Sequence, residues 1–394
     1  MPFLLTTLLS ATLWVTVQLQ ATAAVTPVLP GKDSDVVEVL PAITHQRPAP
    51  PVKGAAPRSV TVDAVRTAQL VREDISVARQ TGDTRYWGRA QTALAPWWDK
   101  PDAPADMAVL QATVLQGRHE FDASRVVLNA ALKRTPGHAQ GWLNLAALER
   151  LSARYPESLA ACDAVERAGQ ALYAEACRLE SRSLQGEQAM AAQRLQALLE
   201  QTRDPGQRSW LLSLLAESLE RQGRDAAAGD AFAQSLAAEP DLYTSIALSD
   251  LLLRTGKTAQ ALKLLVPLPA TDAVVLRIAT AHKRLGDPQW RAGRATLLSR
   301  IEELRRRGDD VTLHGRELAL AALWLDGDAT KALALARDNL RLQREPVDWW
   351  VALESARLAG DQAAQTEIRQ AIAAAGLRDV RLAATSAATK TSSR

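Results

Sequence analysis

The stretch from Leu214 to Pro240 reads LLAESLERQGRDAAAGDAFAQSLAAEP, with a run of helix-forming residues on each side of Gly223. Glycine readily adopts the left-handed backbone conformation that ends a helix and lets the chain reverse. In the second run, Ala228 and Phe232 are four residues apart and share one helix face, and Pro240 stops that helix. The stretch therefore predicts a helical hairpin, in which a small residue permits close packing and a larger one fills the space behind it.

The same helix–glycine–helix pattern returns along most of the chain. It occurs at Gly82, Gly117, Gly186, Gly223, Gly256, Gly286, Gly327 and Gly360, and Ser152 fills the one gap. The mean spacing is about 35 residues, which is typical of helical-hairpin repeats. Five residues after four of the glycines come Ala191, Ala228, Ala261 and Ala332, followed four residues later by Leu195, Phe232, Leu265 and Ala336. We expect each second helix to turn these positions toward its partner.

These residues resemble the tetratricopeptide-repeat family. The resemblance is clearest in two repeats, which contain Trp142, Leu145, Ala146, Tyr155 and Ser158, and Leu215, Ala216, Leu219, Gly223, Ala228, Phe232 and Pro240. The phrases GDTRYWGRAQTALAPWW (82–98) and LHGRELALAALWLDGDATKALALARDNLRLQREP (313–346) also resemble exported bacterial tetratricopeptide proteins. For residues 59–380 the resemblance implies an all-α, right-handed α–α solenoid of about nine helix pairs, which folds by stacking.

The first residues are typical of an exported protein. An uncharged apolar stretch at residues 3–17 precedes Ala-Thr-Ala at 21–23, as in a signal peptide with its cleavage site. No Lys or Arg precedes Lys32, so the usual positive charge is missing, and an uncleaved anchor helix is the alternative. Its threonines and glutamines make the segment a poor membrane span. We predict a signal peptide at 1–24, no membrane span after cleavage, and a periplasmic or secreted location in a bacterial envelope.

Two further segments lie outside the repeats. Seven prolines and two glycines between residues 25 and 58 are too many helix breakers for a helix, so we predict an extended Pro-rich linker there. Within it, DVVEVLPAI (35–43) is a short apolar patch, and docking of this patch on the folded body is the alternative to a plain linker. The end of the chain, 381–394, is small and polar and is expected to be disordered.

The composition and motifs give no indication of an enzyme. Lys and Arg outnumber Asp and Glu only by 47 to 44, which gives no electrostatic argument for nucleic acid or an anionic membrane. The sequence contains no nucleophile elbow, phosphate-binding loop, dinucleotide fingerprint or paired-histidine zinc motif. We therefore predict no catalytic residues, no cofactor and no metal, with carboxylates assembled from distant segments as the alternative.

The two cysteines fall on either side of one expected turn. Cys162 lies seven residues before Gly169, and Cys177 lies eight residues after it. In an antiparallel hairpin, similar distances from the turn place two residues at the same height on facing helices. Export supplies an oxidising compartment, which favours a Cys162–Cys177 disulfide. Two buried thiols and a metal pair are the alternatives, and the metal is disfavoured because no histidine lies at ligand spacing.

The resemblance also implies where a partner binds, because the first helix of each tetratricopeptide pair lines a concave groove. Counting back from each glycine places residues in the groove that include Tyr173, Glu180, Trp210, Glu217, Arg221, Tyr243, Asp250, Arg254, Arg284, Trp350 and Arg357. Three of the arginines share one slot and predict a row suited to carboxylates or polar backbone, beside aromatic contacts. The alternative is that the arginines form internal salt bridges and that the tryptophans belong to the core.

The leading functional hypothesis is a non-enzymatic, exported scaffold that binds a protein or peptide partner in the cell envelope through its groove. Assembly or maturation of another envelope protein is a role of this kind. A glycan-positioning accessory domain of cell-wall or polysaccharide machinery is the alternative from a different class. An enzyme with an unrecognised site is the third.

Overall fold

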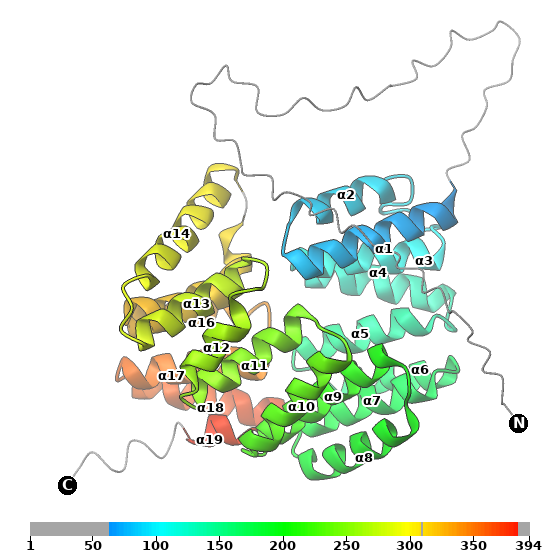
Figure 1. Ribbon diagram of the computed structural model, residues 1–394. Coiled ribbons are helices and arrows are strands. Elements are labelled where there is room, and N and C mark those ends of the chain that lie inside the picture. The colour runs from blue at the N-terminus through cyan, green and yellow to red at the C-terminus, as the bar shows by residue number, and fades with distance from the viewer. Residues whose placement is uncertain (1–62, 309, 385–394) are drawn as a thin grey trace, which may run out of the picture. The chain divides into compact units, whose positions relative to one another are not determined.

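The computed structural model describes residues 63–308 and 310–384 of the chain, and within them every regular element is a helix (Figure 1). The first ten helices are α1 (Ala64–Thr81), α2 (Arg85–Leu94), α3 (Ala105–Gly117), α4 (Phe121–Arg134), α5 (Ala139–Leu151), α6 (Tyr155–Arg167), α7 (Ala171–Leu184), α8 (Gln188–Gln201), α9 (Pro205–Arg221) and α10 (Asp225–Ala238). The others are α11 (Leu242–Arg254), α12 (Thr258–Leu265), α13 (Asp272–Arg284), α14 (Trp290–Arg306), the 3-10 helix η1 (Val311–His314), α15 (Gly315–Ala321), the π-helix η2 (Ala322–Asp326), α16 (Ala329–Asn339), α17 (Pro346–Leu358), α18 (Gln362–Ala375) and α19 (Val380–Ala384). The predicted signal peptide (1–24) and linker (25–58) lie outside the described residues.

Helices α1 to α18 pack as nine successive pairs, and each pair also contacts the next, so the predicted tetratricopeptide-like α–α solenoid is confirmed for the described residues. Polar side chains at several turns start the first helix of a pair. Asp204 accepts a hydrogen bond from the backbone N–H of Gln207, and Asp241 accepts one from that of Thr244. Each such N-cap satisfies a backbone donor that has no partner within the helix.

Seven of the eight repeat glycines have the left-handed backbone expected at a helix end, and Gly117 does not. In that repeat His119 takes the left-handed conformation, with φ of 62°. A Cβ at Gly117 would lie 2.4 Å from the indole ring of Trp87. Gly117 is therefore needed for close packing, because Trp87 occupies the slot that a small residue fills in other repeats. At the gap in the glycine series, Ala153 is left-handed instead of Ser152.

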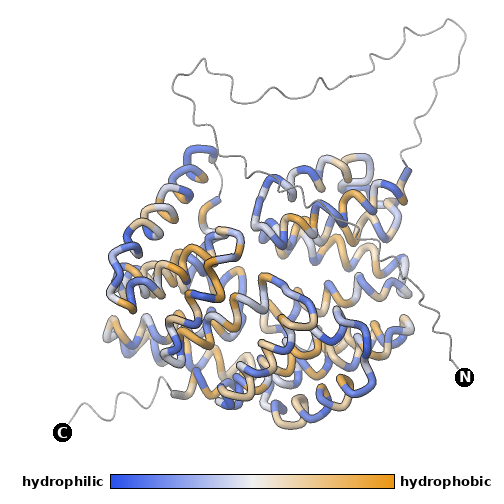
Figure 2. Tube along the Cα trace, viewed as in Figure 1, coloured by the Kyte–Doolittle hydropathy of each residue, from blue (hydrophilic) through white to orange (hydrophobic). Residues whose placement is uncertain are grey.

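The expected small and large core positions of the second helices are buried. Ala191, Ala228 and Ala261 are fully inaccessible, as are Leu195, Phe232 and Leu265, which lie one helical turn later. Apolar residues accordingly lie between the helices, as the colouring of Figure 2 shows. Removing this packing at a residue such as Phe232 costs about 3 to 5 kcal/mol, so the pattern read from the sequence is also a main source of stability.

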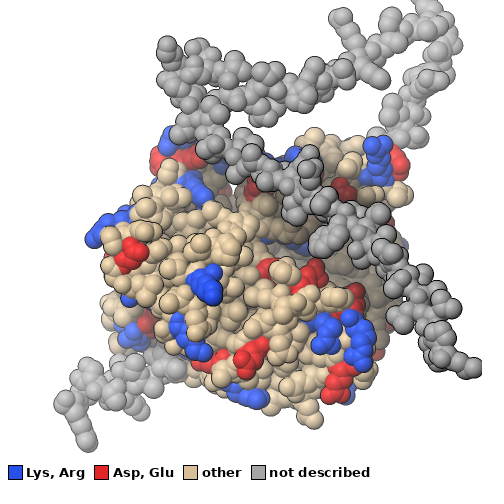
Figure 3. All heavy atoms as spheres, in the orientation of Figure 1, with Lys and Arg blue, Asp and Glu red and all other residues tan. Residues whose placement is uncertain are grey.

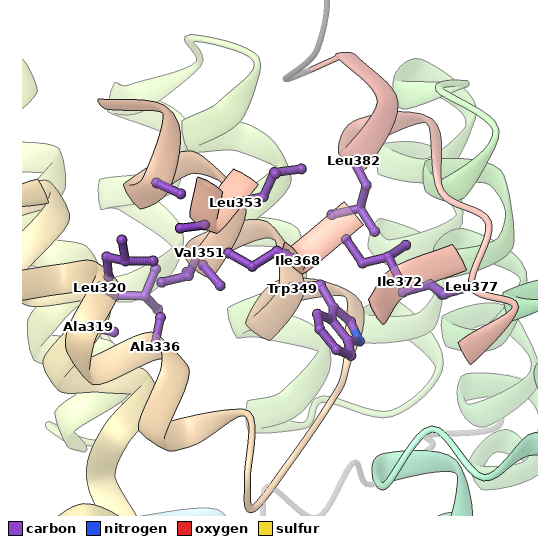
Figure 4. Packing of buried hydrophobic residues seen from close by; sticks show 14 of the residues in the cluster. Ala319, Leu320, Ala336, Trp349, Val351, Leu353, Ile368, Ile372, Leu377 and Leu382 are labelled. Atoms are coloured by element: carbon purple, nitrogen blue, oxygen red, sulfur yellow. The ribbon is translucent and has the colours of Figure 1, made fainter. Parts of the chain in front are cut away.

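The C-terminal helices form the largest apolar cluster of the described residues, and this cluster reaches far back along the chain. Trp349 of α17 lies close to Ile372, Leu377 and Leu382 (Figure 4). The same cluster contains Tyr155 of α6 and Leu184 of α7. The last hairpin and α19 are therefore packed against the middle of the solenoid as well as against their neighbours in sequence.

Two loops fasten this long-range contact. The backbone N–H of Arg344, in the α16–α17 loop, donates to the carbonyl of Leu151 at 2.7 Å. The N–H of Arg378 donates to the carbonyl of Leu184 at 2.8 Å. Helix α19 includes residues 381–384, and its Arg381 forms an ion pair with Glu220 at 2.7 Å. The predicted start of a disordered tail at 381 is therefore too early, and residues 385–394 lie outside the described part.

The structure joins Cys162 of α6 and Cys177 of α7 in a disulfide, with their Cα atoms 5.6 Å apart. Both residues are buried, at 0% and 3% exposure, in the apolar cluster around Leu145 and Ala161. The pairing expected from the distances to the turn is thus confirmed. Within the described residues, no helix combines the length and apolar character needed to cross a membrane.

Candidate functional site

A cavity of about 450 Å³ opens on the first helices of four consecutive pairs, α5, α7, α9 and α11, and we call it the acidic cavity. The N-cap residue of α17 closes one side. Its lining residues are Ala147, Arg150, Leu151, Glu180, Gly206, Ser209, Trp210, Ser213, Leu214, Glu217, Glu239, Asp241, Tyr243, Thr244 and Glu345. First helices supply most of this lining because the second helices lie behind them, as expected for a tetratricopeptide-like array.

Carboxylates outnumber cations around the acidic cavity by five to one. Glu180 pairs with Arg150 at 2.8 Å, and both side chains are largely buried. Glu345 pairs with Arg316, which lies outside the lining, at 2.6 Å. For Glu239, no ion pair is found among residues 63–308 and 310–384. The wall therefore carries more negative charge than its own cations neutralise.

Aromatic side chains provide the apolar part of the wall. The ring of Trp210 lies 5.5 Å from that of Tyr173, measured between centroids, and the hydroxyl of Tyr173 accepts a hydrogen bond from Gln207. Tyr243 is 61% exposed, and its hydroxyl donates to Glu217 at 2.6 Å. The cavity thus combines carboxylates with the flat amphipathic faces of Trp and Tyr, and these two aromatic residues often contribute most of the binding energy at recognition surfaces.

Two titrating groups at this cavity have raised pKa values, for different reasons. Burial raises the pKa of Glu180 to about 7, the charge of Arg150 opposes the rise, and the nearby Glu217 adds to it. For Tyr243, whose side chain is largely exposed, the charge of Glu217 is the main reason why the pKa is raised well above its ordinary value. At Tyr243, therefore, the negative charge of the wall disfavours further ionisation, whereas at Glu180 burial is the main cause.

The structure brings together part of the predicted groove set. Glu180, Trp210, Glu217 and Tyr243 line the acidic cavity, and Tyr173 contacts Trp210. Arg221 lies behind Glu217, only 3% exposed, and donates from Nε to the hydroxyl of Ser183 at 3.1 Å. Arg221 therefore supports the wall and is not presented to the cavity.

The other predicted groove residues are engaged with other parts of the protein. Arg254 pairs with Glu220 and Asp225 at 2.9 and 2.8 Å, Asp250 pairs with Arg277 at 2.6 Å, and Arg357 pairs with Glu354 at 2.6 Å. Arg284 donates to the backbone carbonyl of Leu253, and Trp350 packs 6.2 Å from Trp324. The arginine row thus has internal partners, as in the alternative stated above, and a ligand carboxylate must compete with them.

Three lining carboxylates were absent from the predicted set. Glu239 and Asp241 flank Pro240 at the turn between α10 and α11, where the proline and the N-cap pattern give a local signal. Glu345 lies more than a hundred residues further along the chain. Only the docking of the α16–α17 loop against Leu151 brings Glu345 to the cavity.

A second cavity of about 450 Å³ is lined by residues on the other side of the Leu151–Arg344 contact, and we call it the basic cavity. Its lining residues are His119, Glu120, Phe121, Asp122, Ala123, Arg125, Ser152, Arg154, Arg341, Leu342 and Arg344. Arg125 and Arg154 both pair with Glu149, at 3.1 and 2.6 Å. Over the face visible in Figure 3, by contrast, side chains of both signs are interspersed.

No family model matches the chain, and no curated protein matches it. The chain is similar to the solved structure of the APC/C hetero-tetramer Cut9–Hcn1, at 14% identity and a TM-score of 0.41, covering 78% of this chain and 74% of that one. For Naa15/Naa10 bound to HypK-THB the values are 15%, 0.29, 81% and 51%, and for the P58(IPK) TPR domain 13%, 0.20, 75% and 98%. At these identities and TM-scores the likenesses carry no argument, and the fold rests on the helix pairs themselves.

Proposed function

We propose that this protein is an exported, non-enzymatic scaffold that binds a protein or peptide partner of the cell envelope in the acidic cavity. The observation that carries the proposal is the convergence of Trp210, Tyr243 and several carboxylates on the first helices of consecutive pairs. Amphipathic aromatic side chains in a concave site give contact area at low entropic cost, which suits binding of an extended segment.

Export is supported by two features of the chain. The apolar stretch at residues 3–17 with Ala-Thr-Ala at 21–23 is typical of a signal peptide. The disulfide between Cys162 and Cys177 suits an oxidising compartment, because cytosolic thiols are normally kept reduced. Detection of a mature chain that begins near residue 24 in the periplasmic or culture fraction tests this part, and an intact Met1 there contradicts cleavage.

Affinity capture from envelope extract tests the binding. The tagged wild-type chain is compared with Tyr243→Ala and Trp210→Ala variants, and Tyr86→Ala serves as the aromatic control because Tyr86 lies on α2, outside the cavity lining. We expect a partner that wild type and Tyr86→Ala retain and that both cavity variants lose while they melt like wild type. Equal capture by all four chains contradicts binding in the acidic cavity.

A glycan is the second candidate ligand. Trp210 and Tyr243 offer rings that suit sugar faces, and the carboxylates accept hydrogen bonds from hydroxyl groups. Binding of the wild-type chain to purified peptidoglycan or exopolysaccharide, lost in the Trp210→Ala variant, favours this alternative. Capture of a protein partner by the wild-type chain, together with no binding to either glycan, favours the scaffold.

A further inference from the structure

The acidic cavity differs from the remaining surface in the sign and the shape of its lining. Five carboxylates surround a space of about 450 Å³, and Arg150 is the one cation among the lining residues. Arg150 is already occupied by Glu180, and Arg221 and Arg316 pair with Glu217 and Glu345 from behind the wall. These pairs leave Glu239 and Asp241 without a counter-charge in any ion pair of the described residues.

We propose that the acidic cavity binds a cationic side chain, arginine or lysine, from an extended basic segment of a protein partner. The inference rests on the proposed function and specifies the chemistry of its ligand. A cationic head group complements the surplus carboxylates, while the aliphatic stem of the same side chain packs on the aromatic wall. A carboxylate or phosphate ligand meets like charge here and is rejected.

The aromatic residues add a second contribution that a carboxylate cluster lacks. Trp210 is partly buried against Tyr173, which holds its ring in place. Tyr243 is 61% exposed and hydrogen-bonded to Glu217, so its ring and a carboxylate lie at one point of the wall. A guanidinium or ammonium placed over an aromatic ring is attracted by the negative face of the ring, and Trp is the strongest partner.

The volume fits one such side chain with its neighbouring backbone. Small-ligand sites usually enclose about 300 to 1,000 Å³, and this cavity lies at the lower end of that range. The raised pKa of Tyr243, caused mainly by the charge of Glu217, agrees with an unneutralised negative site. A bound cation favours the ionised form of Glu180, whereas burial favours the neutral form of the same carboxyl group.

Isothermal titration calorimetry with two short peptides tests the proposal on the full mature chain. The probes are acetyl-Gly-Arg-Gly-Arg-Gly-amide and its counterpart with glutamate in place of arginine. We expect only the arginine peptide to bind, with affinity falling as NaCl rises from about 50 to about 500 mM. Glu239→Gln should weaken binding about three-fold, and Glu217→Gln with Glu239→Gln at least about ten-fold.

Matched variants separate binding from folding. Glu217 also faces the buried Arg221, so its replacement can affect stability, whereas Glu239 is exposed and has no ion pair in the described chain. The single Glu239→Gln variant therefore keeps the test valid. Glu200→Gln is the control, because Glu200 is also exposed, lies on α8 outside the cavity lining, and should leave arginine-peptide binding unchanged.

Four outcomes overturn the proposal. Equal binding of both peptides removes the charge preference, and unchanged binding by the double variant places the peptide elsewhere. Binding only to a chain ending at residue 384 assigns the cavity to the chain's own tail, which contains Lys390 and Arg394. If the arginine peptide fails to bind while Tyr243→Ala still loses a captured envelope protein, the cationic ligand is wrong and the scaffold stands.

Discussion

The acidic and basic cavities have the same volume, about 450 Å³, and opposite surplus charge. One loop lies between them. Glu345 lines the acidic cavity, and its neighbour Arg344 lines the basic cavity, while the N–H of Arg344 holds the loop to Leu151. Adjacent residues of opposite charge are thus directed to opposite sides of a single backbone contact.

The difference teaches how a nearly neutral chain obtains a charged site. Lys and Arg almost balance Asp and Glu in the whole sequence, so selectivity comes from the local sorting of charges. In the acidic cavity most carboxylates come from first helices and their turns. In the basic cavity, Arg125 and Arg154 pair closely with Glu149. The other two arginines, Arg341 and Arg344, come from the docked loop, where Arg341 is 3.8 Å from Asp338. The variants described below test this separation of the two cavities.

Removal of the support for the loop should have the largest effect. Asp348 is fully buried, pairs with Arg316 at 2.7 Å, and accepts hydrogen bonds from Asn339 and from the backbone N–H of Glu345. Asp348→Ala leaves buried donors unpaired and should lower the free energy of unfolding by about 3 to 5 kcal/mol. Chemical denaturation measures it, with the exposed Asp338→Ala as control at less than about 0.5 kcal/mol. Similar losses of unfolding free energy in Asp348→Ala and Asp338→Ala contradict the role of Asp348 in supporting the loop.

The pH dependence of stability sharpens the description of the acidic side. Burial raises the pKa of Glu180 to about 7, and Arg150, Glu217, Arg221 and Glu345 act on it electrostatically. The native state therefore holds a proton that the unfolded chain releases, so the stabilisation is complete below about pH 4 and is lost as pH rises through 7.

Unfolding curves across this window measure the effect. Relative to Glu180→Gln, the wild type should lose about 3 kcal/mol of unfolding free energy between pH 4 and pH 8. Glu200→Gln, on the exposed face of α8, should follow the wild type at every pH. Parallel curves for wild type and Glu180→Gln contradict a raised pKa.

Removal of the disulfide tests how much this bond, next to the wall of the acidic cavity, stabilises the protein. The Cys162–Cys177 bond connects α6, which begins beside the basic cavity, with α7, which carries Tyr173 and Glu180. Closing a loop with a sequence separation of 15 stabilises a protein by about 3 kcal/mol in the chain-entropy model. The Cys162→Ser, Cys177→Ser double variant should lose that amount in denaturation under oxidising conditions. No loss relative to wild type contradicts a structural bond.

The smallest effects on stability should come from charges that only the cavities use. Glu239→Gln and Arg341→Ala should each change the unfolding free energy by less than about 0.5 kcal/mol, because both side chains are exposed. Their effects on ligand binding should differ. Arginine-peptide affinity should fall in Glu239→Gln and stay unchanged in Arg341→Ala, and an equal fall in both contradicts two electrostatically separate cavities.

Much of the fold was predictable because repeats depend on local signals. The glycine spacing, the Ala228–Phe232 pattern and the disulfide all depend on residues near one another in the chain. Gly117 is the instructive exception. It belongs to the glycine series, yet its role is to make room for the indole of Trp87, and the left-handed residue of this turn is His119. A spacing pattern shows that a glycine is present. It does not show whether the glycine is needed for a left-handed turn or for close packing against a neighbouring side chain.

The candidate site was predictable only where it is made from consecutive repeats. Trp210, Glu217 and Tyr243 follow from the period of the first helices, since residues in equivalent slots face the same side. The arginine row could not be resolved in the same way. A long side chain such as that of Arg254 reaches several neighbours, and its pairing with Glu220 and Asp225 depends on distances across helices.

The sequence by itself determined the helix-pair architecture, the buried slots and the pairing of the cysteines, because each depends on spacing within one or two hairpins. Only the tertiary structure decided that Glu345 and Arg344 reach the middle of the solenoid and divide two cavities of opposite charge. The physical reason is that this contact joins segments almost two hundred residues apart. It depends on how small rotations between successive pairs add up, and no local pattern records that sum.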